Sequence, residues 1–120
     1  MIRRKGITVF ESGDWNNLRY TKHVVNSCVC PKEVPITVQF DSKRVIGTAK
    51  NFKVKDGKIT ADIGIEPEYK GFYIAPTVKC EVTIKKKVRY IDNFEVIECS
   101  IVSFPLSRGT KRKQAMFGKV

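Results

Sequence analysis

The feature that most restricts the fold of this chain is the pair Asp56-Gly57, which lies between two segments of β character. Residues 51–55 precede the pair, and residues 58–65 follow it with apolar and polar side chains in alternation. Both central residues of the tightest hairpin turn need positive φ, and Asp-Gly meets this need well. The sequence therefore predicts a β-hairpin over residues 51–65.

The rest of the chain also has β character. Ile36, Val38 and Phe40 alternate with polar residues, which is the period of a strand with one buried face. Residues 85–87 are three lysines between two β-prone segments, so we expect a hairpin tip in solvent there. Further strands are predicted for residues 7–10, 23–30, 45–49, 72–75, 78–84, 88–91 and 96–104.

Helices are expected to be few, because no amphipathic segment of ten or more residues is present and residues 15–24 come nearest to one. Sequential hairpins without βαβ alternation predict a mainly β, single-domain antiparallel barrel or sandwich. The predicted core comprises Val38, Phe40, Ile46, Phe52, Ile59, Ile63, Val82, Val96 and Val102.

The length of 120 residues fits one domain. We expect residues 1–106 to form the β-domain, beginning with a short basic N-terminal arm over residues 1–5, and residues 107–120 to form a basic tail. Neither end has the apolar periodicity to order by itself, although Met116, Phe117 and Val120 offer the tail an apolar anchor on a partner. No signal-peptide pattern is recognised near the N-terminus. No run approaches the about 20 apolar residues that cross a bilayer, so no membrane partner is expected.

The charge is strongly positive, with 23 Lys and Arg against 12 Asp and Glu and a net charge of +11. Such an excess favours polyanionic partners, either nucleic acid or an acidic protein surface, although solubility alone is an alternative explanation. The residues predicted to bind a partner lie at the two ends of the chain: Arg3, Arg4, Lys5, Arg108, Lys111, Arg112, Lys113, Phe117 and Lys119.

Four cysteines are present, at positions 28, 30, 80 and 99. The default prediction is reduced thiols. Cys28 and Cys30 are not expected to bridge each other, because alternate strand residues lie roughly 6–7 Å apart. The C-x₂-C spacing of zinc knuckles is absent, so no metal or other cofactor is predicted, and metal binding by the four thiols is left open.

No catalytic residue is predicted from the residue types and spacings. His23 is the one histidine, and no nucleophile motif lies beside it. The glycines are scattered and form no phosphate-binding loop. Glu95 and Glu98 face opposite sides of a strand, which does not support a carboxylate pair for glycoside hydrolysis.

Four motifs in order resemble the prohead maturation proteases of tailed bacteriophages, which share the herpesvirus assemblin fold. They are residues 34–41 (VPITVQFD), 45–49 (VIGTA), 55–61 (KDGKITA) and 94–105 (FEVIECSIVSFP). The last is similar to the family's Glu-x-Ser-Leu-Val-x-x-Pro strand. The resemblance spans residues 34–105 and rests on the order and spacing of the motifs.

The departures concern the catalytic residues that the resemblance implies. The family's catalytic histidine precedes the aspartate of the first motif, and here that residue is Phe40, which cannot accept a proton. The family's nucleophilic serine is expected within residues 72–82, which contain none; Thr77 and Cys80 are the nearest substitutes. The additional helical sequence of the full proteases is also missing.

The resemblance therefore implies a scaffold reused for binding. We expect a non-enzymatic capsid-associated protein, acting as an auxiliary, decoration or stabilising protein. Its partners would be the major capsid protein or other virion proteins. It would be made in the host cytoplasm and located in the virion in many copies. Two alternatives stay open: a nucleic-acid-binding β-barrel module, and a divergent active protease that uses Thr77 or Cys80 with His23.

Overall fold

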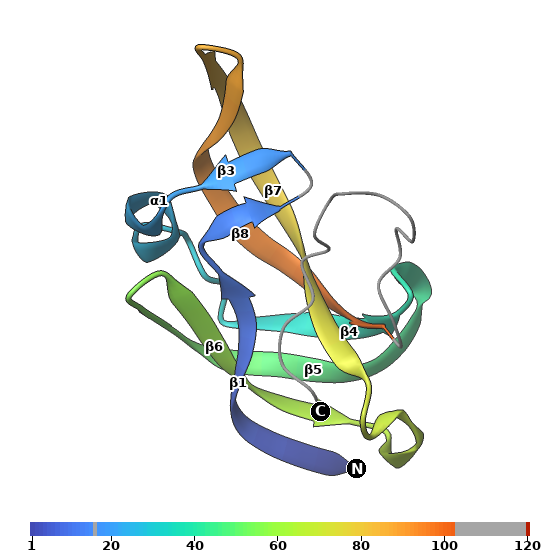
Figure 1. The fold of residues 1–120 in the computed structure, drawn as a ribbon. Helices are drawn as coiled ribbons and strands as arrows, with labels where there is room; N and C mark the ends of the chain where they lie inside the picture. Colours follow the sequence, from blue (N-terminus) through green and yellow to red (C-terminus); the bar gives the residue numbers. More distant parts are fainter. Residues whose placement is uncertain (16, 103–119) are drawn as a thin grey trace.

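The computed structural model describes residues 1–15, 17–102 and 120, and its ribbon is drawn in Figure 1. The strands are β1 (Ile2–Glu11), β2 (Gly13–Trp15), β3 (Leu18–Tyr20), β4 (Glu33–Val38), β5 (Asp41–Lys55), β6 (Lys58–Ile65), β7 (Tyr73–Lys85) and β8 (Val88–Val102). One short helix, α1 (Lys22–Asn26), and one 3₁₀ turn, η1 (Pro67–Tyr69), interrupt them. Within the described ranges, neither is long and apolar enough to cross a membrane.

The predicted hairpin over residues 51–65 is confirmed as the junction of β5 and β6. Lys55 pairs with Lys58 across the turn, and Asp56 and Gly57 have φ values of 51° and 74°. The turn also packs closely, because a Cβ on Gly57 would lie 2.6 Å from the hydroxyl oxygen of Ser12. The positive φ of the turn and the close packing against Ser12 therefore both require glycine at position 57.

The strands form a single curled sheet that resembles half of a barrel (Figure 1). Their order is β1-β6-β5-β4-β8-β3-β2. The remaining strand, β7, lies off this path and also pairs with β8. Most pairs are antiparallel, but β3 and β4 each run parallel to β8. The prediction of a mainly β single domain is confirmed, and the curl favours the barrel over the sandwich.

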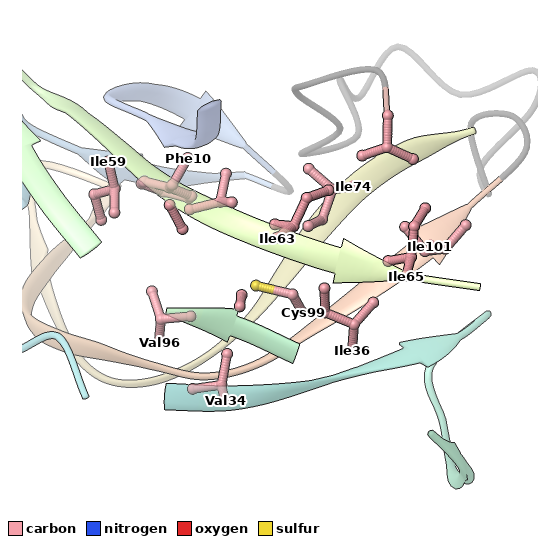
Figure 2. Packing of buried hydrophobic residues seen from close by; sticks show 14 of the residues in the cluster. Phe10, Val34, Ile36, Ile59, Ile63, Ile65, Ile74, Val96, Cys99 and Ile101 are labelled. Atoms are coloured by element: carbon pink, nitrogen blue, oxygen red, sulfur yellow. The ribbon is translucent and has the colours of Figure 1, made fainter. Parts of the chain in front are cut away.

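The core lies on the concave side of this sheet, where isoleucine and valine side chains from several strands meet (Figure 2). Phe10, Tyr20 and Phe94 add an aromatic cluster whose ring centroids lie 4.8–5.6 Å apart. Elsewhere, β5 and β6 approach so closely that a Cβ on Gly47 would lie 1.9 Å from the carbonyl oxygen of Gly64.

The predicted core is correct at six positions and wrong at two. Val38, Ile46, Ile59, Ile63, Val96 and Val102 are buried, and Phe52 is half-buried. Phe40 is 40% exposed because it lies in the β4–β5 turn, where its φ of 61° breaks the strand alternation. Val82 is 46% exposed because its part of β7 has extended beyond the core.

Two predicted segments take another structure. Residues 23–26 of the expected strand 23–30 belong to α1, because the Thr21 side chain accepts a hydrogen bond from the Val24 amide and caps a helical turn that buries Val25. The expected N-terminal arm is part of β1, where Arg3 pairs with Gly64 and Arg4 with Ile63. Backbone pairing with β6 orders this segment without any apolar periodicity of its own.

Candidate functional site

Polar side chains meet where β4 runs parallel to β8. Thr37 and Ser100 are direct partners across the two strands, and both side chains are fully buried. Glu98 lies two residues before Ser100 on the same face of β8 and is half-buried. We call these three residues, with the backbone amide of Phe40, the Thr37–Ser100 cluster.

Every hydroxyl of the cluster has a hydrogen-bond partner. The Thr37 hydroxyl donates to Oε1 of Glu98 at 2.5 Å. The Ser100 hydroxyl donates to the Thr37 carbonyl at 3.2 Å and accepts the Phe40 N–H at 2.7 Å. The two hydroxyl oxygens are 3.2 Å apart. Among the described residues, no buried side-chain nitrogen or oxygen lacks a partner, so the cluster joins β4, its turn and β8 as a satisfied network.

The cluster brings together two of the motifs that carry the sequence resemblance. Thr37 and Phe40 come from residues 34–41, whereas Glu98 and Ser100 come from residues 94–105. Phe40 takes part through its backbone amide, and its ring contributes no proton acceptor. A serine hydroxyl becomes a nucleophile only when a base removes its proton, and the Ser100 proton is donated to a backbone carbonyl.

The alternative catalytic residues are not joined to one another. Thr77 and Cys80 lie on β7, opposite Glu98 and Phe94 of β8. His23 is exposed on α1, and in the described part of the chain no hydrogen bond links its side chain to either residue. The structure therefore does not assemble a nucleophile–base pair from these three side chains.

The thiols fall into one close pair and two separate groups. The Sγ atoms of Cys28 and Cys30 are 3.5 Å apart, closer than strand geometry suggested, because neither residue lies in a named strand. The hydrogen bond between them raises the pKa of Cys28 and lowers that of Cys30. Burial raises the pKa of Cys99 to about 12, and raises that of Cys80 as well. All four cysteines are described, and no three His, Cys, Asp or Glu side chains gather as a metal site in that part of the chain.

The predicted partner-binding residues are placed only in part. Arg3 and Lys5 are exposed on β1, and Arg4 is half-buried beside them. The tail positions Arg108, Lys111, Arg112, Lys113, Phe117 and Lys119 lie outside the described residues. Val120 is buried, and its backbone is hydrogen-bonded to Gly71 and Phe72.

A basic surface that was not among the predicted partner-binding residues lies on the far half of the β7–β8 hairpin. This half projects from the sheet at the top of Figure 1. We call residues 79–95 the distal ribbon. Between residues 82 and 91 the ribbon carries four cations and no carboxylate: Lys85, Lys86, Lys87 and Arg89. The absence of acidic residues over this stretch was the available sequence signal.

The distal ribbon has one side-chain contact with β3 and one hydrogen bond between its own two strands. The Arg19 guanidinium of β3 lies 5.6 Å from the centre of the Tyr90 ring, and the Thr83 hydroxyl donates to the Asp92 carboxylate. A pocket of about 270 Å³ opens at the base, and its walls are Val29, Lys79, Cys80, Glu81, Asn93, Phe94 and Glu95. Near the tip, Val82 and Ile84 are 46% and 67% exposed.

No family model, curated protein or solved structure matches this chain.

Proposed function

We propose that this chain is a non-enzymatic, capsid-associated protein of a tailed bacteriophage, which acts as an auxiliary, decoration or stabilising component of the virion. The observation that carries the proposal is the Thr37–Ser100 cluster. Its residues come from the two motifs that resemble prohead proteases, yet both hydroxyls are buried and hydrogen-bonded. The one position in the cluster that the resemblance assigns to catalysis, Phe40, takes part only through its backbone amide, as expected of a protease-like scaffold that serves a structural role.

We expect no peptidase activity because no base is placed to take a proton from a hydroxyl nucleophile. A hydroxyl nucleophile needs a base within hydrogen-bond reach, and position 40 supplies a phenylalanine where the family has histidine. The hydrogen bonds that Ser100 makes to Thr37 and Phe40 stabilise the junction of β4 and β8. The proposal requires no cofactor.

The binding role is supported by charge. A net charge of +11 on 120 residues raises the encounter rate with an acidic capsid surface, and complementary charge fixes the register of the contact. Arg3 and Lys5 present part of that charge on β1. A shell made of many identical subunits offers many identical sites, which gives multiple copies in each particle.

The direct test is the composition of purified virions. We expect the protein to co-sediment with assembled capsids of its phage at a fixed copy number, and added protein to rebind to capsids from which it was stripped. Protein that stays in the supernatant would contradict the proposal. Binding to an oligonucleotide with a steep salt dependence, but not to capsids, would support the nucleic-acid-binding alternative instead.

A second test addresses the protease alternative. Incubation with the capsid protein should leave that protein uncleaved. Cleavage that disappears in Thr77→Ala or Cys80→Ala variants would show a divergent protease and contradict the proposal.

A further inference from the structure

The outer edge of β7 is open along the distal ribbon. β8 pairs with one side of β7 from Tyr73 to Lys85, and no other strand in the described residues pairs with the opposite side. Residues 79–82, 84 and 85 are exposed. An open edge presents unpaired backbone N–H and C=O groups, and these can accept one further strand.

The exposed side chains on this edge are apolar at alternate positions. Val82 and Ile84 are two residues apart on one strand, so their side chains share a face of the ribbon. Both side chains are largely exposed to solvent. A docked strand with apolar residues at alternate positions would cover both and form cross-strand pairs with them.

The charge around this edge discriminates between possible strands. The cations close to it are Lys79, Lys85, Lys86, Lys87 and Arg89. The carboxylates of the distal ribbon are Glu81, Asp92 and Glu95, and that of Asp92 already accepts a hydrogen bond from Thr83. The five cations outnumber these three carboxylates, so the ribbon keeps a net positive charge. A second copy of this chain, itself at +11, would bring further positive charge to the edge, and this repulsion disfavours pairing between copies. The same lysines would attract an acidic strand.

From these observations we propose that the distal ribbon binds an extended acidic segment of a partner protein, which adds to the outer edge of β7 as an extra strand. Its backbone would pair with residues 79–85, its apolar side chains would cover Val82 and Ile84, and its carboxylates would face the lysines at the tip. The inference rests on the proposed function in taking a protein as the partner, and it names that partner's chemistry.

The experiment uses a fluorescent synthetic peptide of alternating glutamate and valine as the probe, and measures its binding to the full chain by anisotropy. A peptide of the same sequence with alternate backbone amides N-methylated is the control, because it keeps the charge but cannot form an edge ladder. We expect the unmodified peptide to bind at least about tenfold more tightly. Hydrogen exchange should show new protection in β7 only with that peptide. Equal binding of the two peptides would overturn the proposal.

Matched variants locate the contact. Reversal of Lys85, Lys86 and Lys87 to glutamate should weaken binding at least about tenfold. Reversal of Lys50, Lys53 and Lys55, three exposed lysines of β5, makes the same change in net charge and should have a small effect. Ile84→Ser should also weaken binding, whereas Val45→Ser, at a side chain that is 55% exposed, should not. An equal loss in both triple variants would show attraction without a specific surface, and would overturn the proposal.

A single-stranded oligonucleotide serves as the competing probe. If it displaces the peptide and itself depends on the three lysines at the tip, the ribbon is a nucleic-acid contact and the proposal fails. The peptide assay contains no capsids, so its outcome is separate from that of co-sedimentation. Peptide binding without capsid association would contradict the proposed function alone, and capsid association without peptide binding would contradict this inference alone.

Discussion

The two ends of β8 have opposite environments although they belong to one continuous strand. Residues 99–102 lie between β4 and β7 and are buried at every position. Residues 88–90 pair with β7 along their length and with β3 only at Tyr90, and all of them are exposed or half-buried. The buried end of β8 has a paired strand on both sides, whereas the exposed end is paired mainly on one side.

The same contrast applies to identical residues. Ile101 is fully buried, whereas Ile84, across the same hairpin and near its tip, is 67% exposed. We therefore expect the first region to determine the stability of the fold, and the second to be free to bind.

The largest expected difference is in core packing. Ile101→Ala should lower the free energy of unfolding by about 2–5 kcal/mol, because it leaves a cavity in a region closed on both sides. Ile84→Ala should change that free energy by less than about 0.5 kcal/mol. Urea unfolding followed by circular dichroism measures both. A similar loss in the two variants would show that the ribbon is part of the stabilising core.

A second test compares two threonine–carboxylate hydrogen bonds between strands. Thr37 donates to Glu98 inside the Thr37–Ser100 cluster, and Thr83 donates to Asp92 on the exposed ribbon. Thr37→Val should cost about 1–3 kcal/mol, because it removes a donor from buried polar groups. Thr83→Val should cost a few tenths of a kcal/mol at most, because water replaces the donor. Comparable values for the two variants would mean that the cluster is open to water.

The response to alkaline pH should also depend on the buried region. Burial raises the pKa of Tyr20 to about 12, whereas an unfolded tyrosine ionises near 10. Between these values the folded state keeps a proton that the unfolded state releases, so stability should fall as the pH rises from about 10 to 12. We expect a fall of about 1–2 kcal/mol from this group. Unfolding measured over that range should be flatter in Tyr20→Phe, and an unchanged slope would assign the loss to other groups such as Cys99.

The smallest effect concerns thiol chemistry, and it should leave stability unchanged. Cys80 is exposed at the base of the distal ribbon, and Cys99 is buried with its pKa raised to about 12. In a Cys28→Ser, Cys30→Ser background, a thiol reagent at neutral pH should label Cys80 in the folded protein. Cys99 should react only after denaturant is added. Rapid labelling of Cys99 under native conditions would show that the buried end of β8 opens frequently.

Local features of the fold were predictable from the sequence, whereas the features set by distant neighbours were not. The hairpin at Asp56-Gly57 was predicted because two adjacent residues determine its turn. The exposure of Val82 was missed because alternation reports a side chain's face and not whether another strand covers it. The helix α1 was missed because the Thr21 cap outweighs the β preference of two valines over one turn.

The candidate site shows the same limit. The motif that includes Glu98 and Ser100 was singled out from the sequence, but Thr37 was only one of the polar residues that alternate with Ile36, Val38 and Phe40, and its burial was not predicted. It is buried because β8 pairs parallel to β4, and no periodicity in either segment encodes that contact. The distal ribbon carried a charge signal, yet its projection depends on where the other strands end.

The parallel pairing of β4 with β8 also has a consequence for the order of folding. Thr37 and Ser100 are 63 positions apart, whereas the β5–β6 and β7–β8 hairpins close over two-residue turns. Hairpins form in about 1–10 μs, but the distant contact must first overcome the entropy of a long loop. We expect the two hairpins to form early and the docking of β8 on β4 to limit the folding rate. During that interval the edge of β4 stays open, so this is the stage at which the chain is most prone to aggregate.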